Sequence, residues 1–137
     1  MAALVFFDIN ILLYAISSAP KEWIKRDRAR ELLESFEVGT SLQVIQEFHV
    51  NATGKLKKTV QAHEISGLID WLLRQPLVET DAALFREAVL LQGRYQISYW
   101  DAAVVAAAQR LESESLCSED LQHGQKFGDV KIVNPFA

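Results

Sequence analysis

The stretch Ala3-Leu-Val-Phe-Phe-Asp-Ile-Asn10 decides the fold of this 137-residue chain. Five apolar residues run directly into Asp8, and Asn10 follows two positions later. A short apolar run bounded by polar residues indicates a strand buried on both faces, as in a parallel sheet. Asp8 then lies at the carboxyl edge of the sheet, where open α/β folds bind their ligands. The alternative role for Asp8 is to cap the next helix, because aspartate is a favoured N-cap residue.

The composition fits one ordinary globular domain over residues 1–137, with half of the residues apolar and 23% charged. No apolar run approaches the ~20 residues of a membrane span, and the first residues lack the basic segment of a signal peptide. Cys117 is the only cysteine, so no internal disulfide forms, which indicates a reducing compartment such as the cytoplasm. The net charge of −4 argues mildly against a nucleic-acid partner, because phosphate contacts favour a basic surface.

Strand and helix patterns alternate along the rest of the chain. Hydrophobic spacing predicts helices over residues 9–16, 21–36 and about 60–74, and further helices after the N-cap candidates Ser41, Thr80 and Ser98. Gly39 is expected to end the second helix. Short strands are predicted at residues 40–42, 77–79, 116–118 and 130–133. This alternation predicts a three-layer α/β/α sandwich around a central parallel sheet of four to five strands.

Four acidic residues map to the carboxyl edge of this sheet, because strand ends and helix starts share one edge in βαβ units. Asp8 and Asp120 each follow a strand, and they lie close together if these strands are neighbours where the strand order reverses. Glu47 lies about two turns into its helix, and Asp101 lies in the first turn after Ser98. Each acid also has an ordinary explanation as a cap or a solvated surface residue.

A divalent cation explains such a gathering of acids. Unpaired carboxylates packed together repel and raise each other's pKa, and a bound cation removes that penalty. Oxygen ligands without matching histidine or cysteine suit Mg²⁺ or Mn²⁺ rather than Zn²⁺. His49, His63 and His123 show no metal-ligand spacing, no glycine-rich phosphate loop is present, and Ser118 lacks the context of a nucleophile elbow.

The sequence resembles the PIN-domain ribonucleases, and among them the VapC-type toxins of bacterial and archaeal toxin–antitoxin pairs. The resemblance covers nearly the whole chain. It is carried by four blocks in order: Phe7-Asp-Ile-Asn10 with Leu13-Tyr-Ala15, Gln43-Val-Ile-Gln-Glu-Phe48, Ile97-Ser-Tyr-Trp-Asp-Ala102, and Ser118-Glu-Asp-Leu-Gln-His-Gly124. Where the family often has Thr or Ser after the first aspartate, this chain has Ile9, a departure that removes a hydroxyl but no ligand.

The resemblance implies a PIN-like fold and a site in which Asp8, Glu47, Asp101 and Asp120 are the catalytic metal ligands. Asn10 and Ser118 match positions that orient carboxylates or metal-bound water. The implied activity is that of a Mg²⁺-dependent endoribonuclease, with Mn²⁺ as the other suitable ion. A metal-activated water would hydrolyse the RNA phosphodiester bond and leave 5′-phosphate and 3′-hydroxyl ends. Asp8 and Asp101 are expected to be the most direct ligands, and the other two acids to complete the site directly or through water.

The resemblance also implies the partners: a transfer RNA or ribosomal RNA substrate, a cognate antitoxin protein that holds the toxin inactive, and a second copy in a homodimer. Lys55, Lys57 and Lys58 are expected to steer RNA, with Lys21, Lys25 and Arg26 as a second patch. The alternative for both patches is an ordinary solvated surface. Trp23 and Ile24 are expected to pack in the core or a dimer interface, and an antitoxin groove is the alternative.

Three other classes of protein share parts of this pattern. A haloacid-dehalogenase-type phosphatase also begins with an apolar strand and an aspartate, but it requires a second aspartate where this chain has Asn10. A receiver domain requires a lysine at a later strand end, where this chain reads Ser118-Glu-Asp120. A non-catalytic PIN-like module that binds RNA or protein is the alternative outside the enzymes, although all four acids are present.

Overall fold

The sheet is built around β1 (Leu4–Phe7), the strand that the opening stretch predicts. The computed structural model describes residues 3–137 and has one sheet with the strand order β3-β2-β1-β4-β6-β5. The other strands are β2 (Glu37–Ser41), β3 (Leu77–Val78), β4 (Ser115–Cys117), β5 (Lys126–Phe127) and β6 (Val130–Val133). β1 pairs in parallel with β2 on one side and with β4 on the other.

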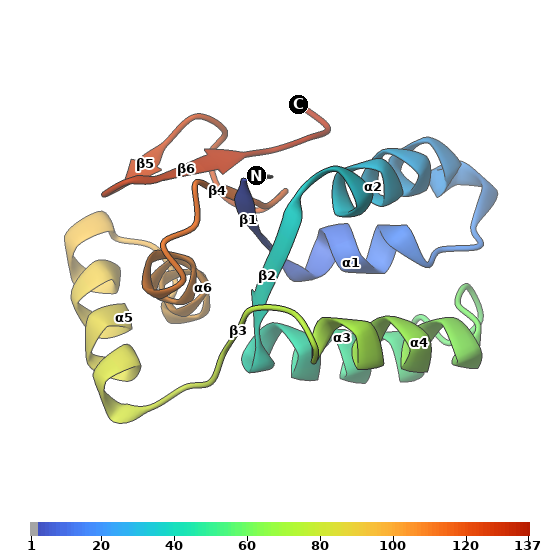
Figure 1. The fold of residues 1–137 in the computed structure, drawn as a ribbon, viewed down its shortest axis with the longest axis horizontal. Coiled ribbons are helices and arrows are strands. Elements are labelled where there is room, and N and C mark those ends of the chain that lie inside the picture. The colour runs from blue at the N-terminus through green and yellow to red at the C-terminus, as the bar shows by residue number, and fades with distance from the viewer. Residues whose placement is uncertain (1–2) are drawn as a thin grey trace.

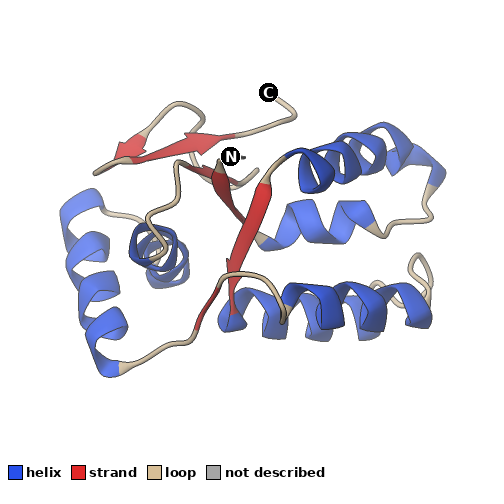
Figure 2. Cartoon of the chain, in the orientation of Figure 1, coloured by secondary structure: helices blue, strands red, loops and turns tan. Residues whose placement is uncertain are grey.

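Helices cover both faces of this sheet. They are α1 (Ile9–Ala15), α2 (Trp23–Ser35), α3 (Leu42–Thr53), α4 (Ala62–Leu72), α5 (Ala82–Tyr95) and α6 (Tyr99–Arg110), with a 3₁₀ turn at Pro20–Glu22. Figure 1 shows α5 and α6 on one side of the sheet and α1 to α4 on the other. The strands form the layer between them (Figure 2). The predicted three-layer α/β/α sandwich is therefore confirmed.

Burial explains why β1 and α6 are apolar on every side. Val5, Phe6 and Phe7 of β1 are all buried, because helices cover both faces of the sheet. Residues 102–108 of α6 are also all buried, because α6 packs between α5 and the strands β2, β4 and β6. Within residues 3–137, no helix has both the length and the apolar content that crossing a membrane requires.

The strand order reverses beside β1. The chain moves outward from β1 to β2 and β3, and then returns through α5 and α6 to β4 on the opposite side of β1. The backbone amide of Asp8 donates to the carbonyl of Cys117 at 3.0 Å, which joins the end of β1 to the end of β4. The carboxyl ends of these two strands therefore lie side by side, at the kind of point where open α/β folds bind ligands.

The parallel part of the sheet contains the strands β3, β2, β1, β4 and β6, in agreement with the predicted four to five. A sixth strand, β5, pairs with β6 in antiparallel fashion and extends that edge. β5 has two residues, too few to show a hydrophobic period in the sequence. The turn between β5 and β6 places Gly128 at φ +60°, a conformation that favours glycine.

Three local predictions are wrong. Gly39 does not end a helix but lies within β2, where a Cβ atom would approach Leu111 Cδ1 at 3.0 Å, so glycine lets α6 pack closely. The N-cap of α5 is Asp81 rather than Thr80, because its carboxylate accepts the Leu84 amide at 2.8 Å. The helix predicted over 21–36 is divided into the 3₁₀ turn and α2. The caps predicted at Ser41 and Ser98 are confirmed.

Truncation of the central strand should be far more damaging than truncation of a surface aromatic. Phe6 has no exposed surface, so Phe6→Ala is expected to lower the free energy of unfolding by about 3–5 kcal/mol. Phe85 on α5 is 51% exposed, so Phe85→Ala should lower it by about 1 kcal/mol or less. Urea denaturation followed by circular dichroism measures both. Equal losses for the two variants would contradict this description of the core.

Candidate active site at the carboxyl edge

Asp8 both caps α1 and faces the end of β4. One carboxylate oxygen, Oδ1, accepts the Ile9 amide at 2.8 Å, which is the expected helix cap. The other, Oδ2, accepts the Ser118 hydroxyl at 2.8 Å. The side chain is buried, with 5% of its residue surface exposed. The two roles that the sequence leaves open for Asp8 therefore coexist, because the cap uses one oxygen and the strand-end contact uses the other.

The environment of Asp8 disfavours its charged form. Burial is the largest influence and raises the pKa of Asp8 to about 6, although the hydrogen bonds from Ile9 and Ser118 act in the opposite direction. The negative charges of Asp120 and Asp101 raise the pKa further. These three carboxylates therefore lie within electrostatic range of one another, and a cation among them would relieve their mutual repulsion.

Asp120 is held against Asp8 by two polar side chains. Asn10 on α1 donates its Nδ2 group to Asp120 Oδ2 at 3.0 Å. The Ser118 hydroxyl, which donates to Asp8, also accepts the Asp120 backbone amide at 3.2 Å. Partial burial, followed by the charge of Asp101, raises the pKa of Asp120. Asn10 and Ser118 thus connect the two acids that follow neighbouring strands.

Asp101 reaches the same edge from the opposite helical layer. Its backbone amide donates to the Ser98 hydroxyl at 3.0 Å, which caps α6. Among residues 3–137 its carboxylate makes no return hydrogen bond to the Ser98 amide, so only half of a capping box is present. The negative charge of this carboxylate raises the pKa of both Asp8 and Asp120.

Glu47 is half-buried in the second turn of α3. Its Oε1 atom accepts the Gln43 side-chain amide at 3.0 Å. The charges that raise the pKa of Asp8 and Asp120 come from Asp101, from Asp120 acting on Asp8 and from Glu119 acting on Asp120. The part that the sequence assigns to Glu47 in the site stays a prediction.

Ligand chemistry and ligand number decide whether these residues suit a metal ion. In the described part of the chain, no three His, Cys, Asp or Glu side chains are grouped so that they could hold an ion as they stand. Mg²⁺, however, keeps several of its own waters and is usually bound by only one or two carboxylates together with substrate phosphates. An all-oxygen edge, at which burial raises the pKa of Asp8 and of Asp120 and the charge of Asp101 raises both further, fits this hydrated mode and does not fit a closed cage of zinc type.

A second polar cluster, which sequence reasoning missed, adjoins this edge. Glu119, next to Asp120, accepts hydrogen bonds from Tyr14 at 2.8 Å and from Lys25 at 2.7 Å. The Lys25 side chain is 41% exposed and pairs with Glu119, and Arg26 pairs with Asp27 at 3.1 Å. That these two residues steer RNA stays a prediction. The sequence carried one usable signal: Tyr14 follows Asn10 by four residues and so lies on the same face of α1.

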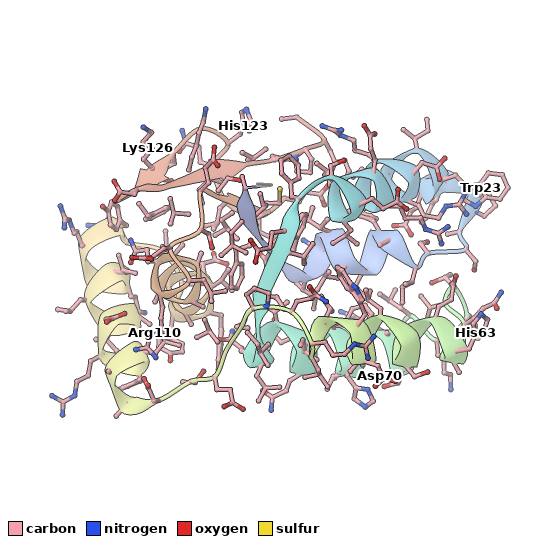
Figure 3. All side chains as sticks on the ribbon, viewed as in Figure 1. Trp23, His63, Asp70, Arg110, His123 and Lys126 are labelled. Carbon is pink, nitrogen blue, oxygen red and sulfur yellow. The ribbon has the colours of Figure 1, made fainter. Side chains whose placement is uncertain are left out.

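Trp23 and Ile24 lie outside the core, so packing in the core is wrong for them, and packing in a dimer interface stays a prediction. Trp23 is 49% exposed, Ile24 is 88% exposed, and Figure 3 shows Trp23 at the outer end of α2. The Arg26 guanidinium lies 5.6 Å from the Trp23 ring centroid. His63 and His123 lie at separate places in Figure 3, and His123 Nδ1 accepts the backbone amide of Asn134.

An apolar groove of about 760 Å³ runs between α2 and α4, and neither Trp23 nor Ile24 lines it. Arg30 of α2 and Glu64 of α4 approach to 3.6 Å across it. Arg30 also donates to the Ala15 carbonyl at the end of α1. The groove is lined by Ala15, Ile16, Arg30, Leu33, Glu34, Phe36, Glu64, Gly67, Leu68 and Trp71.

The fold and the acidic edge define an open α/β protein with a carboxylate site at the point where the strand order reverses. The family model of the PIN domain matches residues 5–126, and the chain belongs to this family. Comparison with curated proteins finds no match. The resemblance to PIN domains that the sequence blocks indicate is therefore confirmed.

Solved structures with the same fold include components of toxin–antitoxin systems. A toxin–antitoxin complex from Klebsiella pneumoniae aligns with a TM-score of 0.68 and 23% identity, over 96% of this chain and 97% of that one. VapC20 of Mycobacterium tuberculosis, a toxin that cleaves the sarcin–ricin loop, aligns with a TM-score of 0.64 and 17% identity, over 85% and 91%. VapBC2 from Rickettsia felis, bound to a promoter DNA fragment, aligns with a TM-score of 0.58 and 18% identity, over 85% of this chain and 88% of that one. At these identities the likeness is one of fold.

The raised pKa of Asp8 predicts a pH-dependent stability. An aspartate with a higher pKa in the folded than in the unfolded state destabilises the folded protein once it is ionised, so wild-type stability should fall as the pH rises from about 4 through 6. Asp8→Asn removes the charge, so we expect it to be more stable than wild type by about 1–3 kcal/mol at pH 7.5 and no more stable at pH 4. Urea denaturation in EDTA across this range measures the difference. A variant that is less stable than wild type at pH 7.5 would contradict the assignment.

Proposed function

We propose that this PIN-domain protein is a metal-dependent endoribonuclease and the toxin of a toxin–antitoxin pair. The observation that carries the proposal is the contact set at the end of β1 and β4: Ser118 and Asn10 hold Asp8 and Asp120 together at the edge where this fold binds ligands. Membership of the PIN family and the fold shared with toxin structures support the same conclusion.

In this proposal, Asp8 and Asp101 hold a Mg²⁺ or Mn²⁺ ion most directly, and Asp120 completes the site. Glu47 would take part directly or through water. Such an ion would lower the pKa of bound water and neutralise charge that develops on the phosphate. Ser118 donates to the Asp8 carboxylate and accepts the Asp120 backbone amide, and Asn10 donates to the Asp120 carboxylate, so these two residues would orient the acids for the ion. Hydrolysis then leaves 5′-phosphate and 3′-hydroxyl ends.

A path for RNA leads from the acids to the lysine-rich turn after α3. A cavity of about 160 Å³ is lined by Asn10 and Tyr14 of α1 at one end and by Leu56 and Thr59 at the other. Lys55, Lys57 and Lys58 in this turn are exposed. Their charges can attract the phosphate backbone toward an edge that is itself acidic. We propose transfer RNA or ribosomal RNA as the substrate class.

Removal of either direct ligand should abolish RNA cleavage without unfolding the protein. Asp8→Asn and Asp101→Asn are each expected to lower the cleavage rate by about a hundredfold or more, a larger loss than the 10–100-fold typical of outer-shell partners. Asp70→Asn, on the exposed face of α4 in Figure 3, is the matched control and should cleave like wild type. Gel assays with transfer RNA and ribosomal RNA, in EDTA and after addition of Mg²⁺ or Mn²⁺, measure the rates. Undiminished cleavage by either site variant would refute the proposed site.

We propose that the groove between α2 and α4 receives an apolar segment of the antitoxin. The groove has a mainly apolar lining that also includes the charged residues Arg30, Glu34 and Glu64. Arg30 and Glu64 there can exchange their contact with each other for contacts with a partner segment. This surface replaces Trp23 and Ile24 as the candidate antitoxin groove.

A side chain placed in the groove should block the antitoxin and leave the nuclease intact. A Cβ atom at Gly67 would meet no atom within 4 Å, so Gly67→Trp can fill the groove without strain in α4. Gly93→Trp on α5 has the same open surroundings and serves as the control. On co-expression with the small protein encoded beside it, Gly67→Trp is expected to lose co-purification and Gly93→Trp to keep it. Retention of the partner by Gly67→Trp would place the antitoxin elsewhere.

A further inference from the structure

The acidic edge is braced by a cluster that joins four separate parts of the chain. Tyr14 of α1 and Lys25 of α2 both donate to the carboxylate of Glu119, one to each oxygen, at 2.8 and 2.7 Å. Lys25 also donates to the Tyr14 hydroxyl at 3.2 Å, which closes a triangle of hydrogen bonds. The Lys25 ammonium lies 5.1 Å from the ring centroid of Phe136, near the end of the chain, and the Tyr14 ring packs edge-on against Phe136.

The cluster holds Glu119 in place. Only 26% of the Glu119 side chain is exposed, and each of its carboxylate oxygens accepts a hydrogen bond. The Lys25 charge is further stabilised by the faces of two aromatic rings. These contacts are stronger than those of an ordinary surface ion pair, because they are partly desolvated and multiply hydrogen-bonded.

Side chains, rather than the sheet, hold the segment that carries Asp120. Ser118 still donates its amide to the Val133 carbonyl, but residues 119–121 make no backbone–backbone hydrogen bond within the described part of the chain. Their position depends on the buried side chain of Leu121, the Ser118 contact and the bonds to Glu119. Removal of the Glu119 contacts would therefore leave Asp120 with fewer restraints.

One face of α1 holds two consecutive acids. Asn10 donates to Asp120 at 3.0 Å, and Tyr14, one helical turn later, donates to Glu119 at 2.8 Å. Asp8 caps this same helix, so α1 contacts Asp8 at its start and Asp120 and Glu119 along one face. The hydrogen bonds of α1 thus extend from Asp120, a proposed metal ligand, to Glu119, which is not one.

We propose that Glu119, held by Tyr14 and Lys25, is a positioning residue that fixes Asp120 for cation binding. The inference rests on the proposed metal-dependent function. A purely structural brace would contribute to stability alone, whereas a positioning residue also sets the affinity of the acidic edge for the ion. Cation affinity in the absence of RNA therefore separates the two roles.

The test measures Mn²⁺ binding to the metal-free protein at pH 7.5 by isothermal titration calorimetry, with the melting temperature recorded in parallel. Glu119→Ala is expected to weaken Mn²⁺ binding about tenfold, the low end of the range for outer-shell partners. Tyr14→Phe, which loses one hydroxyl and keeps its ring packing, should weaken it a few-fold. Glu119→Gln keeps an acceptor for Tyr14, so it should recover part of the affinity lost in Glu119→Ala.

Two control variants remove similar groups elsewhere. Tyr95→Phe removes a tyrosine hydroxyl beside Phe127, where the ring contact is also edge-on. Arg110→Met removes a 2.9 Å ion pair with Asp81 between α6 and the start of α5, at the opposite end of α6 from Asp101 and within the α5–α6 layer of Figure 3. Both should bind Mn²⁺ like wild type. Arg110→Met should also lower the melting temperature, because it removes an ion pair, and so it shows whether loss of stability alone weakens Mn²⁺ binding.

The outcomes distinguish this inference from the proposed function. If Glu119→Ala and Tyr14→Phe lose thermal stability but bind Mn²⁺ with wild-type affinity, the cluster is a structural brace and the inference is wrong. Should Glu119→Ala fail to fold, Tyr14→Phe decides the question. If wild type binds no Mn²⁺, or Asp8→Asn binds it equally well, the metal site itself is refuted and the inference falls with it.

Discussion

The structure depends on a buried carboxylate at the junction of two neighbouring strands. Asp8 ends the central strand, caps α1 and accepts the hydroxyl of Ser118 from the strand beside it, while its own amide bonds to Cys117. Asp8 thus connects the central strand β1, the helix α1 and the segment at the end of β4. Because each contact fixes the same carboxylate, a displacement at any of these elements would move the site.

This junction concentrates negative charge in a chain whose other charges are nearly balanced. Asp101 and Asp120 add their fields to that of Asp8, and burial strengthens the effect by reducing solvent screening. The charged form of Asp8 is therefore unfavourable in the folded chain alone, and the proposed cation would stabilise it. Sites that bind ions commonly store free energy in this form, since binding releases it.

Separate surfaces of the same helical layer serve the two kinds of partner proposed here. The side of α1 that carries Asn10 and Tyr14 faces the acids and the cavity toward the lysine turn. The end of the same helix, at Ala15 and Ile16, contributes to the groove between α2 and α4. A segment bound in the groove would thus contact the helix that also orients Asp120, which offers a physical route from antitoxin binding to the nuclease site.

The sequence by itself determined the strand that runs into Asp8, the alternation of strands and helices, and the caps at Ser41 and Ser98. These follow from local periodicity and from the preference for serine at helix starts. Only the tertiary structure decided that β1 neighbours β4, that Ser118 bridges Asp8 and Asp120, and that Lys25 pairs with Glu119. The physical reason is that these contacts join side chains about a hundred residues apart, or depend on rotamers, and local pattern constrains neither.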